Sequence, residues 1–134
     1  MPRNGERGFT MIEILVVLTI VVILGAIALP AFFNQRAKAQ DTDAKSAATV
    51  AAGALEVYHQ DHESFAGATT AALEDIEPSL KQASGLAVTP AADGYTLSVD
   101  SATGTAFKVK RDGGTTERTC GAPGSGGCPQ SGGW

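Results

Sequence analysis

A single acidic residue at the start of a long apolar run is the first candidate for chemistry in this sequence. Glu13 is followed by the 20 residues from Ile14 to Phe33, none of which carries a charge. An ionised carboxylate in a bilayer costs about 3 kcal/mol on insertion scales, and less close to the interface. A cationic partner would offset this cost, because a paired charge is much less costly to bury than a single one.

Two cysteines, Cys120 and Cys128, lie in a glycine-rich and proline-rich segment beyond the apolar run. Such a pair can form a disulfide or half of a metal site. No histidine or further cysteine lies near it in sequence, and a segment that follows a membrane-inserting run favours an oxidising compartment. We therefore predict a disulfide, which would close a short loop and stabilise the fold by about 2.5 kcal/mol. Trp134 is expected to cover nearby apolar surface.

Other groups of polar residues form no recognisable catalytic or metal site. His59 and His62 can share a helix face, but they lie where a helix is expected to end and have no matching ligand group elsewhere. The carboxylates in residues 74–77 lack a companion nucleophile or base. The glycine-rich tail lacks the strand, helix and Lys-Ser/Thr pair of a phosphate-binding loop. We predict that the chain is not an enzyme and needs no cofactor or metal.

The net charge of −4 argues against general electrostatic binding to nucleic acid. Lys108, Lys110 and Arg111 form a small basic cluster. They alternate with Phe107 and Val109, a pattern typical of the solvated face of a strand. No direct nucleic-acid binding is predicted.

The N-terminal segment has the features of a membrane-inserting helix. Its first eight residues, MPRNGERG, are polar and positively charged, and the uncharged run would extend about 30 Å as a helix. The basic flank should stay in the cytoplasm, which places the rest of the chain outside. A cleaved secretory signal, for instance with cleavage after Ala28, would have a shorter apolar region and no acid near its start. A plain membrane anchor would have no need for Glu13.

A third interpretation accounts for these features together. The string Gly8-Phe9-Thr10-Met11-Ile12-Glu13, followed by a long apolar helix, resembles the class III signal of type IV pilins. The resemblance is close over residues 4–33, extends through Tyr58 and is only architectural beyond it. It implies cleavage by a prepilin peptidase between Gly8 and Phe9, and N-methylation of Phe9.

The resemblance also implies a partner for Glu13. Cleavage would create a positive amine at Phe9, and in a staggered bundle of helices Glu13 of one subunit would neutralise the Phe9 amine of its neighbour. Pro30 matches a position near which the family's helix often bends or loosens. Gly25 adds a second weak point, whereas many pilins carry their glycine where this chain has Val22.

The remaining sequence predicts one long helix followed by a small sheet. A narrow apolar stripe at helical spacing continues the helix to about residue 60, with polar residues such as Asp41 and Glu56 on other faces; the stripe comprises Ala44, Ala48, Ala51, Leu55 and Tyr58. A short helical turn is expected within residues 70–80. Strands are expected at 86–89, 95–99, 106–110 and 115–119, separated by turns at 101–104 and 112–114.

The predicted fold is α+β and pilin-like, with the amphipathic half of the helix packed on an antiparallel sheet. We expect a leader peptide at 1–8, an apolar assembly and transmembrane helix at 9–33, and a globular head at 34–134. The expected function is that of a structural subunit, a major pilin, of a type IV pilus.

Expected partners are further copies of the chain, the prepilin peptidase, the pilus assembly machinery and, before assembly, the cytoplasmic membrane. The final location is an extracellular pilus. The alternatives are a pseudopilin of a type II secretion or DNA-uptake system and, from another class, a monomeric membrane-anchored binding module.

Overall fold

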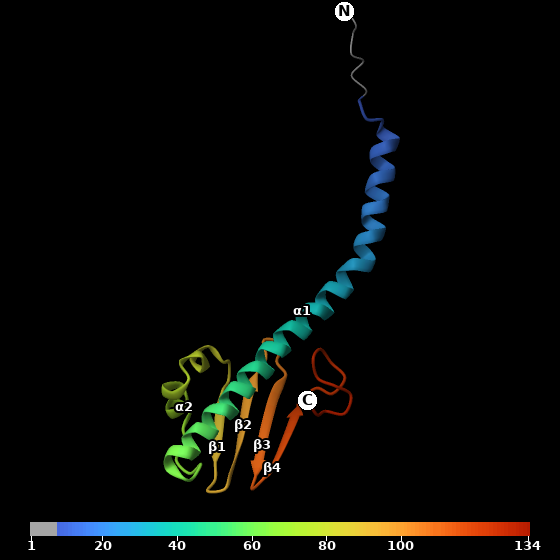
Figure 1. Ribbon diagram of the computed structural model, residues 1–134. Coiled ribbons are helices and arrows are strands. Elements are labelled where there is room, and N and C mark those ends of the chain that lie inside the picture. Colours follow the sequence, from blue (N-terminus) through green and yellow to red (C-terminus); the bar gives the residue numbers. More distant parts are fainter. Residues whose placement is uncertain (1–7) are drawn as a thin grey trace, which may run out of the picture. The chain divides into compact units, whose positions relative to one another are not determined.

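The computed structural model describes residues 8–134, and its longest element is the helix α1 (Met11–His62) (Figure 1). The described chain divides into two compact units, of which one ends at Asn34 and the other comprises Gln35–Trp134. The long helix expected from about residue 10 to about residue 60 is therefore confirmed. Pro30 lies inside α1 without ending it. The bend predicted near Gly25 and Pro30 stays a prediction.

The first unit is an apolar helix whose side chains are exposed. The exposed fractions of its large apolar residues range from 47% for Ile14 to 91% for Met11. By length and composition, α1 contains a segment apolar enough to cross a membrane. Its apolar residues surround the helix instead of forming one stripe, which is typical of a helix that is covered on all sides.

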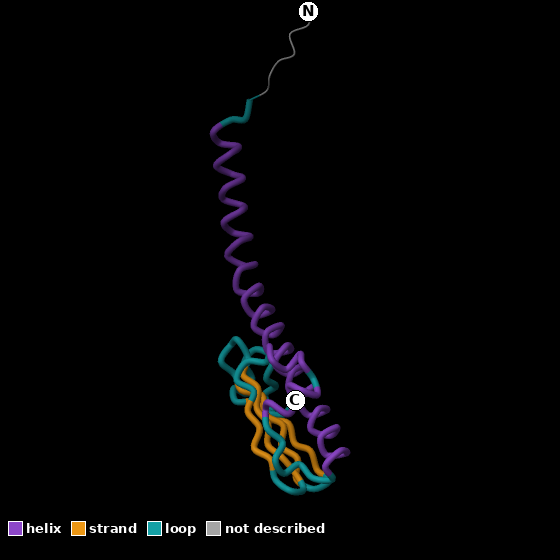
Figure 2. The backbone as a smooth tube through the Cα atoms, turned by 90° about the vertical axis from the view of Figure 1, so that its left-hand side faces the viewer, coloured by secondary structure: helices purple, strands orange, loops and turns teal. Residues whose placement is uncertain are grey.

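The second unit packs a four-stranded antiparallel sheet on α1 (Figure 2). The strands are β1 (Ala87–Pro90), β2 (Gly94–Asp100), β3 (Ala106–Asp112) and β4 (Thr115–Cys120), paired in the order β1-β2-β3-β4. All four predicted strands are present. Each joins its neighbour through a short turn, so the meander follows from the local sequence.

The predicted helical turn consists of two short helices, α2 (Thr70–Ile76) and η1 (Pro78–Gln82). Pro78 separates them, because a proline disfavours helical backbone at the residue before it, and Glu77 is indeed extended. Both helices begin with a side-chain cap: Thr69 accepts a hydrogen bond from Ala72 N–H, and Glu77 accepts one from Ser79 N–H.

The core lies between α1 and the sheet. The helix contributes mainly small side chains, which allow close approach, and the strands contribute larger ones such as Leu97, Val99, Phe107 and Val109. The predicted stripe on α1 is buried from Ala44 to Leu55, while Tyr58 is half-buried. Phe65, Leu73 and Leu80 complete the core from the segment after α1.

The C-terminal segment folds back beside β4 (Figure 1). Cys120 and Cys128 form a disulfide, as predicted, and the Cys120 N–H donates to Gly132 O at 2.8 Å. The Trp134 ring packs edge-on against Phe107 with 5.9 Å between ring centroids, and its Nε1–H donates to the Thr119 carbonyl at 2.9 Å. Trp134 therefore covers apolar surface, as expected.

Candidate functional site

The start of α1 is held by a reciprocal pair of hydrogen bonds between Thr10 and Glu13. The Glu13 N–H donates to Thr10 Oγ1 at 3.2 Å, and the Thr10 N–H donates to Glu13 Oε2 at 3.4 Å. This is a capping box, in which two side chains satisfy two N–H groups that the helix leaves without partners. Glu13 thus lies in the first turn, where the helix dipole favours a negative charge. The Thr-x-x-Glu spacing was a visible signal for this role, which our reading of the sequence missed.

The bond between Gly8 and Phe9 lies just before the helix in exposed backbone. The Phe9 side chain is 80% exposed. A Cβ added to Gly8 would meet no atom within 4 Å, so packing within the described chain does not require glycine at this position. Both residues that form the bond are therefore exposed in the described structure.

The surface between Phe9 and Ile23 is almost entirely apolar and contains a shallow open groove. Thr10 and Thr19 are its polar members, and the Thr19 hydroxyl donates to the Leu15 carbonyl at 2.8 Å. The surface offers no group suited to catalysis; it can pack against lipid or against another apolar helix.

The predicted bend residues Gly25 and Pro30 lie in the same unit as Glu13, whereas Cys120 and Cys128 lie in the other.

At the end of α1, the His62 ring stacks on Tyr58 with 4.0 Å between ring centroids, and its Nδ1 lies 3.0 Å from the Tyr58 carbonyl oxygen. The His59 ring packs instead on Phe65, at 4.5 Å. Within residues 8–134, no group of three or more potential metal ligands is present.

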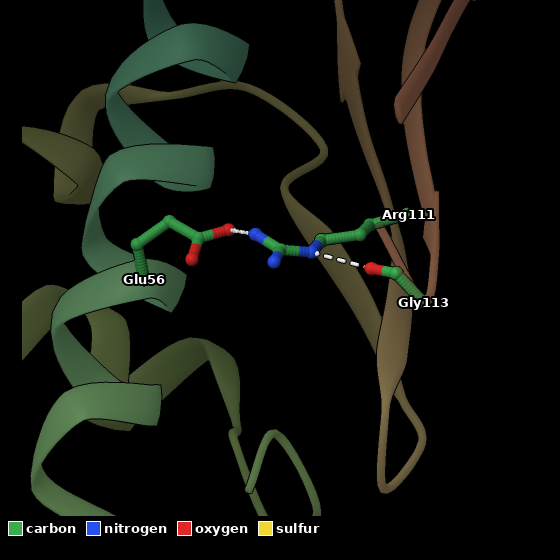
Figure 3. Close-up of polar contacts among 3 residues, drawn as sticks. All are labelled: Glu56, Arg111 and Gly113. Carbon is green, nitrogen blue, oxygen red and sulfur yellow. Dashed lines mark hydrogen bonds and ion pairs between the residues drawn. The ribbon is translucent and has the colours of Figure 1, made fainter. Parts of the chain in front are cut away.

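The prediction that Arg111 belongs to a solvated basic face is wrong. Lys108 and Lys110 are exposed, but Arg111 has the same parity as the buried residues of β3 and therefore points to the helix side of the sheet. Figure 3 shows its guanidinium paired with Glu56 of α1, while its Nε–H donates to the Gly113 carbonyl at 3.1 Å.

This pairing links β3 to α1 near the C-terminal end of the helix. The guanidinium also lies 5.3 Å from the ring centroid of Phe65. Tyr95 is buried nearby, and burial together with the negative charge of Glu56 raises the pKa of its phenol above the ordinary value of 10.0.

The placement of Asp41 on a polar face is also wrong, because its side chain is only 1% exposed. Asp41, Ala44, Ala48, Ala51 and Leu55 follow one helical stripe, and extending that stripe three residues backward would have predicted its burial. A carboxylate is almost never fully buried unless partners satisfy it. Those partners come from distant segments, which the sequence alone does not bring together.

Comparisons with known proteins match the beginning of this chain. Residues 3–29 match the family model described as the prokaryotic N-terminal methylation motif. A fimbrial protein of Eikenella corrodens is 39% identical over 61 residues, which are 46% of this chain and 40% of that protein. A fimbrial protein of Neisseria meningitidis serogroup B is 39% identical over 67 residues, which are 50% of this chain and 39% of that protein.

A type IV major pilin of Neisseria gonorrhoeae is 40% identical over 57 residues, which are 42% of this chain and 34% of that protein. The chain thus spans less than half the length of each of these relatives. No solved structure matches significantly.

Proposed function

We propose that this chain, which carries the N-terminal methylation motif and the α+β fold of pilin-like proteins, is a structural subunit of a type IV pilus filament, a major pilin. The proteins that this chain resembles are structural proteins without enzyme activity. The observation that carries the proposal is the apolar segment from Phe9 to Phe33, whose large side chains are at least 47% exposed. So large an apolar surface requires a covering environment.

The covering environment changes during the life of the subunit. Before assembly it is the cytoplasmic membrane, since the segment is long and apolar enough to span it and has a basic N-terminal flank. In the filament it is the corresponding helices of other copies. The pilus assembly machinery would move the subunit from one environment to the other.

Processing at Gly8–Phe9 would precede assembly. Three observations support it: the bond lies before the helix, it is exposed, and Gly8 has no packing role within the described chain. A prepilin peptidase that requires glycine would explain the residue type. Methylation of the new amine on Phe9 would follow.

Glu13 would then exchange partners. In the precursor its carboxylate accepts the Thr10 N–H. After cleavage a neighbouring subunit presents the positive amine of Phe9, a much stronger partner for a carboxylate in apolar surroundings. Because the two charges meet at only one stagger of the helices, their pairing would set the register of the filament.

The relatives favour a pilus over a secretion pseudopilus, since they are named fimbrial proteins and a type IV major pilin. The disulfide-fastened C-terminal loop fits the same choice. A pseudopilin would share the helix and its processing, but its assemblies would be short and its copy number low.

Mass spectrometry of filaments sheared from cells tests the proposal. The chain should be abundant in the sheared fraction, begin with N-methylated Phe9 and contain the Cys120–Cys128 disulfide. A chain confined to the membrane that retains Met1 would instead support the monomeric anchored module. A processed chain that is absent from long filaments would support the pseudopilin.

A further inference from the structure

A buried carboxylate joins three segments of the second unit that are distant in sequence. Asp41 of α1 accepts hydrogen bonds from Ser101 Oγ and Thr103 Oγ1, both at 2.6 Å, and from the Gly127 N–H at 2.8 Å. The two hydroxyls belong to the β2–β3 loop (101–105), and the amide belongs to the loop closed by the disulfide. Asp41 is the first buried side chain along α1.

The glycines of the disulfide loop make this contact sterically possible. A Cβ on Gly127 would lie 2.8 Å from the Asp41 Cβ, and a Cβ on Gly126 would collide with the carboxylate itself. Gly126 also has a φ of +56°, which side chains with a Cβ rarely adopt. Two glycines in succession therefore let the loop backbone approach the helix closely enough to donate to Asp41.

The disulfide lies beside this contact and is itself covered. Cys128 follows Gly127 directly and is 3% exposed, while Cys120 is 7% exposed. Both sulfurs belong to the core cluster between α1 and the sheet. A reductant must reach a sulfur atom to act, so it needs the loop to move away first.

We propose that Asp41 is a latch that holds the C-terminal loop against α1, so that the Cys120–Cys128 disulfide becomes accessible to reductants only when the latch opens. The latch is a positioning device for the loop and does not depend on filament assembly. It acts through three hydrogen bonds to an ionised acceptor, which are stronger than bonds between neutral groups. Protonation of the carboxylate weakens all three together.

The surroundings of Asp41 make acid the signal that opens the latch. Burial alone would raise the pKa of Asp41, but the three hydrogen bonds and the positive charge of Lys45 outweigh it and hold the pKa below the ordinary 3.8. Residues 101–105 and 121–127 carry no ionisable side chain, and Asp100 at the end of β2 packs against Gly85. On α1 itself, Lys38 and Asp43 are the other charged neighbours in sequence.

The direction of the pH effect follows from the lowered pKa. A carboxyl group whose pKa is lower in the folded state stabilises that state above the unfolded pKa. This stabilisation is lost as the pH falls through the folded value, which lies below 3.8. The latch is therefore closed at neutral pH and opens only in strong acid.

The test measures how fast tris(2-carboxyethyl)phosphine reduces the disulfide of the full chain in detergent micelles. The phosphine takes the oxygen of one water molecule, and the S–S bond takes the two electrons and the two protons to give two thiols. Asp41→Asn removes the charge, and Asp43→Asn, at an exposed position on the same helix, is the matched control. At neutral pH we expect reduction of the Asp41→Asn chain to be roughly 10- to 100-fold faster than that of the control and of the unmodified chain.

A spectroscopic measurement separates a latch from a merely structural contact. The NMR shift of the Gly127 amide should titrate with a midpoint below 3.8 in the unmodified chain and should not titrate in Asp41→Asn. The reduction rate of the unmodified chain is also divided by that of Asp41→Asn at each pH. This ratio should rise as the pH falls through the same range.

Two outcomes would overturn the latch. One is equal reduction rates for the folded Asp41→Asn and Asp43→Asn chains. If Asp41→Asn fails to fold, Thr103→Val removes a single hydroxyl donor from an exposed loop residue and takes its place. An unchanged reduction rate in Thr103→Val, together with a Gly127 amide that does not titrate in the unmodified chain, is the second such outcome.

Discussion

At the scale of single residues, the carboxylate of Glu13 caps the helix, and in the proposed filament it would also form a charge pair with the amine of Phe9. The cap needs only an acceptor oxygen three residues after Thr10, and glutamine supplies one as well as glutamate does. The charge pair needs a negative charge. The two roles can therefore be separated by a substitution that keeps the shape of the side chain.

Glu13→Gln should insert into the membrane and be cleaved normally, yet yield few or disordered filaments. The capping box survives in this variant, while the partner for the Phe9 amine is lost. Filament yield after shearing, viewed by electron microscopy, and the cleaved fraction on a blot are the two measurements. Thr10→Ala is the converse control, because it removes a hydroxyl of the cap and keeps the charge. Normal filaments from both Glu13→Gln and Glu13→Leu would mean that apolar packing alone sets the stagger.

Gly8→Val should block cleavage without disturbing the rest of the chain. A Cβ at this position would meet no atom within 4 Å in the described structure, so we expect only recognition by the peptidase to suffer. Gly25→Ala, also in open surroundings, should be cleaved at the normal rate. The measurement is the ratio of precursor to mature chain on a blot. Efficient cleavage of Gly8→Val would place the processing site elsewhere.

At the scale of elements, helical and strand periodicity predicted α1 and all four strands because each depends on local patterns. The contacts that join different elements were harder to predict from the sequence. The burial of Asp41 needs hydroxyls 60 and 62 residues away, and the ion pair of Arg111 needs Glu56, 55 residues away. The alternation of side chains along β3 was sufficient to predict the face on which Arg111 lies, since residues 107, 109 and 111 share one face. The break between α2 and η1 at Pro78 could likewise have been predicted from the sequence.

Ala48→Leu should destabilise the second unit by about 1–3 kcal/mol. Ala48 is 0% exposed and lies on the face of α1 that packs on the sheet, so three added carbons have no room. Val50→Leu, on an exposed face two residues later, should change stability little. Thermal unfolding of the full chain in detergent measures the difference. Equal unfolding temperatures for the two variants would show that the sheet does not pack closely on this stripe.

Cys120→Ser should release the C-terminal segment while leaving membrane insertion intact. The disulfide and the segment after β4 belong to the second unit, and insertion uses the first. Trp134 is the one tryptophan of the sequence, so its fluorescence reports directly on whether it still packs against Phe107. A shift to longer wavelength is expected, with the membrane fraction unchanged. An unaltered emission spectrum would mean that hydrogen bonds alone hold the segment.

At the scale of the whole molecule, the two units are built for different surroundings. Every residue of the buried core lies in Gln35–Trp134, from Ala44 onward, whereas the first unit contributes none. Folding of the second unit therefore should not require the apolar helix. The first unit exposes its apolar side chains, which under the proposed function lipid or other copies would cover.

Residues 35–134 expressed alone should form a soluble protein with the same sheet. Its core is complete, and removal of the first unit takes away the large exposed apolar surface. Circular dichroism and a dispersed amide NMR spectrum are the measurements, with cooperative thermal unfolding as the criterion. A chain that stays unfolded or aggregates after this truncation would contradict the division into two independent units.

The two outer strands of the sheet bear on how neighbouring heads behave when crowded together. An open strand edge is a template for pairing with another chain, and filament assembly would concentrate many such edges. Here β1 has four residues and ends in Pro90, which cannot donate to a further strand. The edge of β4 carries Glu117 and Arg118 and is bridged at Thr119 by Gly133 of the returning segment. Such edges discourage fusion of adjacent heads into continuous β-structure, so in the proposed filament the apolar helices would be the route by which copies join.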